Sequence, residues 1–168
     1  DEPDRAGEHG TMLGDLHAGV LAVVPPVSLP RQSDRLRCKL RRAGGAFEVS
    51  YAESIAHVPP EAPDMSLCHG DFHPGNVVMS PTGPVIVDWF DACRGDAAAD
   101  IARTSLLLGG GLPNSQHLAH LPGPTPRVLC ALHDAYLATV CTRLGIEAQL
   151  VARWRRIEAL ARLAEGVD

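Results

Sequence analysis

The chain has 168 residues, of which 45% are apolar and 21% are charged, and its formal net charge is −5. This length and composition fit one globular domain and exclude collagen, mucin and coiled-coil sequences. The basic excess of most nucleic-acid-binding proteins is missing, and no apolar run reaches the ~18 residues of a transmembrane helix. We therefore expect neither a nucleic acid nor a membrane as a partner.

The start of the chain and its cysteines bear on the cellular compartment. The first ten residues are polar and acidic, unlike a signal peptide, which needs a basic start and an apolar run. The cysteines number five, lie far apart and form no CxxC pair, which argues against a disulfide framework and a cysteine zinc site. We expect a cytoplasmic protein.

The first half of the chain predicts two helices. Residues 1–10 read as a frayed terminus. Leu13, Leu16, Val20 and Val24 recur at helical spacing, which predicts an amphipathic helix over residues 12–24 that the following proline pair stops. A basic stretch over residues 30–42 predicts a short surface helix that a glycine pair ends.

A β-hairpin is predicted in the middle of the chain, followed by more helices. Two apolar runs, at 77–79 and 85–87, flank a turn-forming cluster at 80–84, and residues 66–68 add a short extended piece. After Asp100 we expect a helix to residue 108, a loop over 109–126, a helix over 128–144 ended by Gly145, and a last helix from about 150 to 166. The predicted fold class is α+β, mainly α, in a single domain spanning residues 1–168.

Chemistry-bearing side chains gather at the open end of the predicted hairpin. Asp71 and Asn76 precede its first strand, and Asp88 follows its second. Because a hairpin returns the chain to its starting end, these side chains can converge. Asn76 and Asp88 then offer oxygen ligands to a hard cation such as Mg²⁺, and Asp71 is left to accept a proton from a hydroxyl. The order H-x-D-x4-N, followed by an aspartate after eleven intervening residues, fits the arrangement that phosphoryl transfer needs.

The same segment resembles the catalytic centre of the aminoglycoside phosphotransferase and choline kinase superfamily, a branch of the protein-kinase-like fold. His69, Asp71, His73 and Asn76 match its HGDxHxxN motif, and Asp88-Trp89 matches its metal-binding pair. Further matches are Gly95-Asp96 with Asp100, in a GDxxxD element, and Leu16-His17 upstream. The resemblance runs from about residue 12 to about residue 108.

The resemblance implies ATP as phosphoryl donor, Mg²⁺ as cofactor and a small-molecule alcohol as substrate. Asp71 corresponds to the catalytic base, and Asn76 and Asp88 correspond to the Mg²⁺ ligands. His69 and His73 are expected to support the catalytic loop. Asp96 and Asp100 are expected to be structural acceptors, with Asp100 anchoring the start of the following helix.

A kinase of this kind also needs a nucleotide lobe with a strand lysine on the phosphates. The only lysine is Lys39, which follows the first predicted helix and so lies in the wrong place. The chain therefore resembles the C-terminal lobe alone. We expect either a fragment or a naturally truncated member, with an N-terminal nucleotide lobe as its missing partner.

Two rival functions stay open at this stage. Without a nucleotide lobe, the chain is alternatively a catalytically silent lobe that acts as a binding or partner module. The HxDxH pattern also resembles a metal-dependent hydrolase, although its spacing to Asn76 argues against that interpretation. The acceptor is not identified by the sequence; Asp91 and Glu158 are candidates for binding a cationic acceptor.

Overall fold

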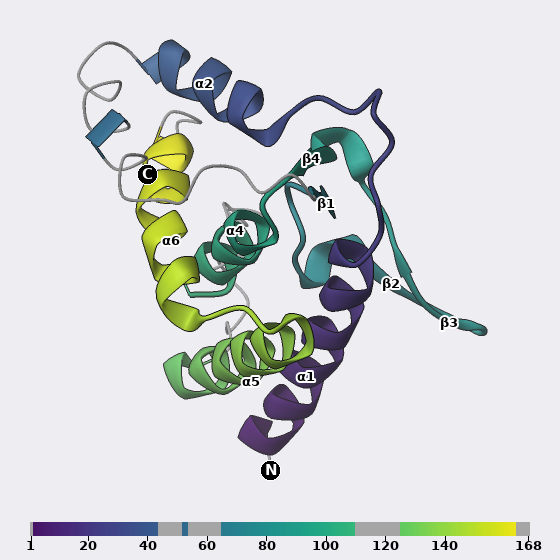
Figure 1. Cartoon of the computed structure of the whole chain (residues 1–168). Helices are drawn as coiled ribbons and strands as arrows, with labels where there is room; N and C mark the ends of the chain where they lie inside the picture. Colours follow the sequence, from purple (N-terminus) through teal and green to yellow (C-terminus); the bar gives the residue numbers. More distant parts are fainter. Residues whose placement is uncertain (1, 44–51, 54–64, 110–124, 164–168) are drawn as a thin grey trace.

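The computed structural model describes residues 2–43, 52–53, 65–109 and 125–163. The first helices are α1 (Glu2–Leu21) and α2 (Gln32–Ala43), and the last are α4 (Ala97–Gly109), α5 (Pro126–Leu144) and α6 (Ala148–Leu163). Between them lie β1 (Ser66–Cys68), the 3₁₀ turn η1 (Pro74–Asn76), β2 (Val77–Ser80), β3 (Gly83–Ile86), the 3₁₀ turn η2 (Trp89–Asp91) and β4 (Cys93–Gly95). This is a mainly helical α+β arrangement with small antiparallel sheets, as predicted (Figure 1).

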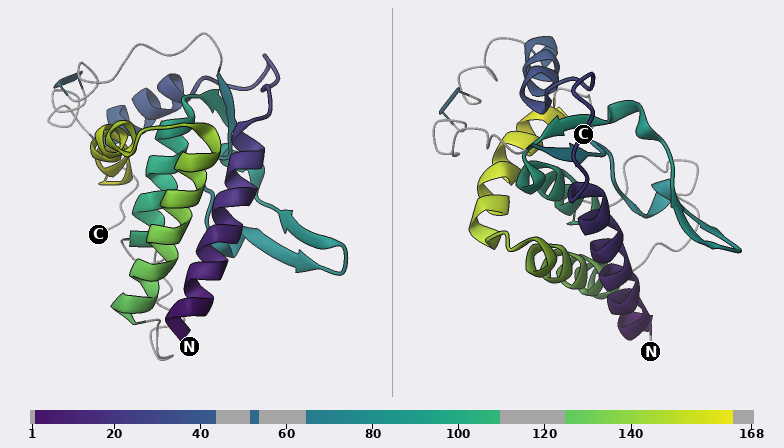
Figure 2. Two further views of the ribbon diagram at one scale, coloured as in Figure 1. Left: turned by 60° about the horizontal axis from the view of Figure 1, so that its bottom comes forward. Right: turned by 45° about the vertical axis from the view of Figure 1, so that its right-hand side comes forward.

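α1 and α5 lie side by side and run in the same direction (Figure 2). A Cβ atom on Gly10 would meet the Leu132 carbonyl oxygen of α5, and one on Gly14 would meet Thr139. Ala6 continues this stripe of small residues at a spacing of four and is buried. The small side chains let the two helix backbones approach closely.

The predicted frayed terminus is wrong, because residues 2–10 form the first half of α1. The helix also ends at Leu21, which is three residues before the predicted end. The error has a physical reason: this half of α1 packs through Ala6 and Gly10, and neither residue adds to an apolar periodicity. Val23 and Val24, which the prediction placed inside the helix, are exposed beyond its end.

α4 is the central helix of the described core. It packs against α5, α6 and β1, and Ile101, Ala102 and Leu107 on it are almost completely buried. α6 contributes Val151, Ile157 and Ala161 to the same hydrophobic core. The helices predicted after Asp100 and in the C-terminal third are thus confirmed, with α4 beginning slightly earlier, at Ala97.

α5 shows clear start and stop features. The Thr125 side chain accepts a hydrogen bond from the Val128 N–H at its start, and Gly145 adopts a left-handed conformation (φ 66°) at its end. The predicted stop at Gly145 is confirmed. Of the predicted loop over 109–126, residues 110–124 lie outside the described part of the chain.

Two small sheets place the site. The predicted hairpin is confirmed as β2–β3, in which Val77 pairs with Ile86, and it projects from the helical body (Figure 1). β1 does not join this hairpin; it pairs with β4, so that Cys68 lies opposite Cys93. The sequence did not predict β4, a strand of three residues whose conformation depends on a partner far away along the chain.

α2 packs against α6 and β4. Its two leucines, Leu36 and Leu40, are buried, whereas Arg37 and Arg41 are exposed. The Gln32 side-chain oxygen accepts a hydrogen bond from the Asp96 N–H at 3.1 Å, which links the start of α2 to the end of β4. None of the described helices is long and apolar enough to cross a membrane.

Candidate active site

The loop that follows β1 is held by its backbone. The Asp100 carboxylate on α4 accepts hydrogen bonds from the His69 N–H at 2.7 Å and from the Gly70 N–H at 2.9 Å. Gly70 has a φ of +82° and lies against the Asp91 backbone, so a side chain there would be both strained and obstructed. One buried carboxylate therefore fixes the turn from which Asp71 projects.

A buried histidine completes this anchor. His17 Nε2 lies 3.1 Å from Asp100 Oδ2, and His17 Nδ1 lies 2.7 Å from the Tyr136 hydroxyl. The His17 ring also stacks on Phe72. Burial by itself would raise the pKa of Asp100, but the hydrogen bonds from His17, His69 and Gly70 outweigh it, so the pKa lies below its usual value. Asp100 is thus an ionised acceptor for both α1 and the loop after β1.

His69 joins the two halves of the site. Its Nε2 donates to the Val87 carbonyl oxygen at 3.0 Å, and its Nδ1 accepts from the Asp71 N–H at 3.3 Å. Burial lowers the pKa of His69, which keeps the ring neutral and compatible with one donor and one acceptor nitrogen. The residue before Asp88 and the candidate base are therefore bonded to the same imidazole.

Asp71 is partly exposed and lies between two basic side chains. His73 Nε2 is 3.5 Å from its Oδ2, and Arg103 Nη2 is 3.5 Å from its Oδ1. Contact with His73 lowers the pKa of Asp71 most, burial opposes this effect, and the positive charge of Arg103 lowers the pKa further. Because His73 Nδ1 accepts from the Gly75 N–H, Nε2 is the ring nitrogen that faces Asp71 with a proton.

Asn76 and Asp88 meet at the open end of the hairpin. Asn76 is buried and donates from Nδ2 to the Asp71 carbonyl oxygen at 2.9 Å, which leaves Oδ1 as the amide atom suited to a cation. Its own carbonyl oxygen accepts from the Val87 N–H at 3.0 Å, directly before Asp88. An amide oxygen and a carboxylate are the donors that Mg²⁺ prefers, so this pair fits such an ion.

The backbone of Asp88 is unusual. With φ 63° and ψ 63° it is left-handed, and among the described residues it is the only one besides glycines with a positive φ. Such conformations cost free energy and concentrate at functional sites, and aspartate tolerates them better than most residues. The fold thus fixes the backbone from which the exposed Asp88 side chain projects.

The two aspartates of the GDxxxD element have roles that the sequence did not distinguish correctly. Asp96, not Asp100, anchors the start of α4: its Oδ1 accepts from the Ala98 N–H at 2.8 Å, and its Oδ2 accepts from Trp154 Nε1 at 3.2 Å. Asp100 lies inside the first turn and points back to the loop after β1. The expected anchor at Asp100 is therefore corrected, because its side chain serves a different segment.

Both candidate residues for a cationic acceptor have arginine neighbours. Asp91 Oδ1 accepts from Arg35 Nη1 at 2.7 Å, and the buried Glu158 lies 3.9 Å from Arg103 Nη1. A small recess beside Gly70 contains both pairs in its wall. The negative charge of each carboxylate is therefore already balanced on this side of the site.

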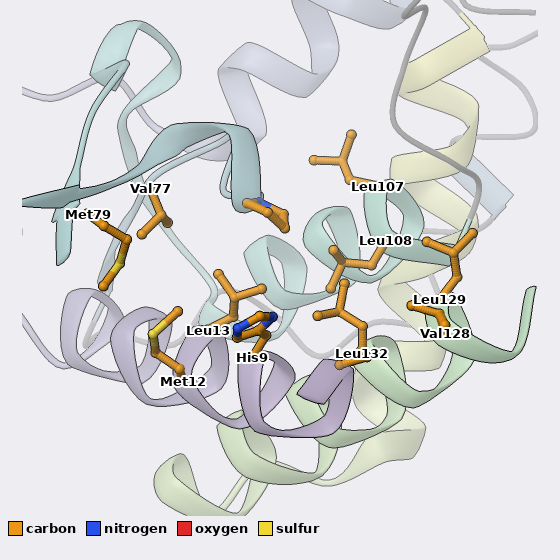
Figure 3. A pocket seen from close by; sticks show the side chains of 12 residues that line it. His9, Met12, Leu13, Val77, Met79, Leu107, Leu108, Val128, Leu129 and Leu132 are labelled. Atoms are coloured by element: carbon orange, nitrogen blue, oxygen red, sulfur yellow. The ribbon is translucent and has the colours of Figure 1, made fainter. Parts of the chain in front are cut away.

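A separate apolar cavity of about 430 Å³ is lined by residues of α1, β2, α4 and α5 (Figure 3). Met12 and Leu13 of α1, Met79 of β2, Leu108 of α4 and Leu132 of α5 face it. His9 supplies the one polar side chain of its described wall. Apart from His9, the described residues of its wall carry no carboxylate, side-chain amide or basic group that phosphoryl transfer would need, so the candidate site is the polar cluster around Asp71.

In the part of the chain that the structure describes, no group of three or more His, Cys, Asp and Glu side chains is arranged to hold a metal ion. Cys68 is completely buried in β1, and burial together with its contact with Cys93 raises the pKa of its thiol. It has the environment of a core residue and not of a nucleophile.

Arg103 is a site residue that the sequence interpretation missed. A signal existed, because residues three apart on a helix share a face, and Asp100 precedes Arg103 by three positions. The link between His17 and Asp100 was not foreseeable from spacing, since the two residues are 83 positions apart.

The comparison with known families agrees with this geometry. The model of the phosphotransferase enzyme family matches residues 2–116, which is more than half of the chain. The matched part includes α1, the loop after β1, the hairpin and α4. A search of curated proteins found no significant match.

Proposed function

The chain belongs to the phosphotransferase enzyme family, and on this premise we propose that it transfers the γ-phosphoryl group of ATP to a hydroxyl group of a small molecule. The observation that carries the proposal is the joint fixation of Asp71, Asn76 and Asp88. Asn76 is bonded to the Asp71 backbone, and His69 is bonded to both the Asp71 N–H and the residue before Asp88.

In this proposal, Asp71 orients the acceptor hydroxyl and accepts its proton. Because its pKa lies below the usual value, the carboxylate is ionised at neutral pH and is a weak base. Such a base suits a loose transition state, in which the proton is needed only as the new bond to phosphorus forms.

Asn76 and Asp88 would hold Mg²⁺ in the proposed site. When bound there, the ion would neutralise negative charge on the phosphate oxygens of the nucleotide. The chain contributes two oxygen ligands at the open end of the hairpin: the buried amide of Asn76, which a hydrogen bond orients, and the exposed carboxylate of Asp88. His69 keeps the two ligand-bearing segments at a constant separation.

The direct test is a turnover assay with ATP, Mg²⁺ and a panel of neutral and cationic alcohols, in which ³¹P NMR detects the phosphorylated product. We expect Asp71→Asn to lower turnover by about 10²–10⁴-fold, the range for loss of a general base. Nucleotide binding should persist, because Asp71 is not one of the proposed Mg²⁺ ligands. Asp34→Asn, which removes an exposed carboxylate on α2, is the control and should leave turnover unchanged. Equal turnover in Asp71→Asn and the wild type would contradict the proposal.

A further inference from the structure

Arg103 bridges the candidate base and a buried carboxylate on a different helix. Its Nη2 lies 3.5 Å from Asp71 Oδ1, and its Nη1 lies 3.9 Å from Glu158 Oε2 on α6. Arg103 is 7% exposed and Glu158 is 3% exposed, whereas the Asp71 side chain is 31% exposed. The guanidinium thus reaches from the interior to the edge of the candidate site.

α4 contacts the loop after β1 through two side chains, one helical turn apart. Asp100 accepts from the backbone N–H groups of His69 and Gly70, and Arg103 contacts the carboxylate of Asp71. One holds the main chain, and the other holds the side chain of the candidate base. One turn of the buried helix α4 therefore contacts both the backbone of the loop and the carboxylate of Asp71.

Stability alone does not explain why Arg103 lies between the carboxylates of Asp71 and Glu158. Desolvation makes buried ion pairs costly, and apolar side chains of similar size often replace them without loss of stability. Asp71 is partly exposed, so it does not need an arginine to remain charged. The planar guanidinium, however, can contact two carboxylates at fixed positions, which a lysine ammonium does less well.

We propose that Arg103, oriented by Glu158, is a positioning residue that fixes the plane of the Asp71 carboxylate for the acceptor hydroxyl. This inference rests on the proposed function. The 3.5 Å contact is long for a hydrogen bond, and such contacts often shorten when substrates bind. Loss of the contact should lower kcat, since a misplaced catalytic group slows the chemical step, and leave KM for ATP unchanged.

A pair of variants separates positioning from structural support. Arg103→Met removes the contact with Asp71 and leaves Glu158 buried without this arginine, so the unfolding midpoint should fall. Arg103→Met combined with Glu158→Met replaces the pair by apolar side chains of similar length, so the midpoint should recover. We expect kcat to stay about 10²-fold below wild type in both variants. Recovery of kcat together with stability in the double variant would overturn the inference.

Two further variants complete the set. Arg103→Lys keeps the charge without the planar fork, and its kcat should lie between those of the wild type and Arg103→Met. Arg143→Met is the matched control, because Arg143 bonds to Asp15 on the outer surface of α1 and α5, away from the site. Its kcat should equal that of the wild type.

A thermodynamic cycle distinguishes failure of this inference from failure of the proposed function. Urea unfolding of Arg103→Met, Asp71→Asn and the combined variant measures whether the two side chains interact. We expect non-additive effects on the unfolding midpoint. Additive effects would overturn the inference whatever the activity. Non-additive effects in a chain that binds Mg²⁺ and ATP but turns over none of the alcohols would retain the Arg103–Asp71 contact and contradict phosphoryl transfer instead.

Discussion

The two halves of α1 contact the rest of the protein in different ways. In the first half, Gly10 packs closely against the α5 backbone, and Ala6 is buried one turn earlier. The second half ends near His17, which is completely buried and bonded to Asp100 and Tyr136. One helix therefore contributes close packing at one end and support for the candidate site at the other. Substitutions in the first half should change stability alone, and those around His17 should change both stability and activity.

The largest of the expected effects on stability is for Asp100→Asn. The amide would present N–H groups to backbone donors that now contact a carboxylate, and His17 would lose its buried anionic partner. We expect the free energy of unfolding to fall by about 3 kcal/mol, with a loss of turnover because the loop carrying Asp71 loosens. Urea unfolding and turnover measure the two effects.

Asp96→Asn is the matched control for that variant, since Asp96 belongs to the same motif but caps α4. We expect a loss of about 1 kcal/mol, typical of a weakened helix cap. Equal losses in the two variants would contradict the assignment of Asp100 as the anchor of the loop after β1.

A smaller effect, confined to stability, is expected for Gly10→Ala. The added methyl group meets backbone atoms of α5, and overpacking of this kind costs about 2 kcal/mol. Gly19→Ala, in the same helix, places its methyl group where no atom lies within 4 Å. It should raise stability by about 0.5–1 kcal/mol, because alanine favours helices over glycine. Thermal unfolding measures both, and the same sign of change in both variants would contradict the described packing of α1 on α5.

The smallest expected effect is a dependence of the free energy of unfolding on pH in the acidic range. Because folding lowers the pKa of Asp100, its contribution to stability is complete above the unfolded value of ~3.9 and is lost as pH falls through the lower folded value. The difference in unfolding free energy between wild type and Asp100→Asn should therefore narrow below about pH 4. Urea unfolding between pH 3 and 7 measures this difference, and a constant or widening difference would contradict the low pKa.

The parts of the fold that local sequence specifies were predictable. The hairpin has a turn cluster between apolar runs, and α5 ends at a glycine in a left-handed conformation. The first half of α1 was not predictable, because its small contact residues form no apolar pattern. β4 was missed for a related reason: three residues take a strand conformation only because they pair with β1.

The candidate site shows the same division. Asp71, Asn76 and Asp88 were predicted as site residues from the spacing of their motif. In the structure, hydrogen bonds link the segments that carry them. The supporting roles were not predicted: the sequence named His17 only as part of the upstream match and Glu158 only as a candidate for a cationic acceptor, because both lie on helices far from the site along the chain. The wrong helix anchor has the same origin: spacing identifies the motif that holds Asp96 and Asp100 but not the partner of each side chain.

The measurement that tests the central claim most directly is Mg²⁺-dependent ATP binding by the 168-residue chain, measured by titration calorimetry. The site formed by Asn76 and Asp88 predicts binding that requires Mg²⁺ and is lost in Asp88→Ala. The control variant Asp34→Ala should bind as the wild type does. Binding of Mg²⁺ and ATP that Asp88→Ala leaves unchanged would contradict the assignment of this cluster as a phosphoryl-transfer site.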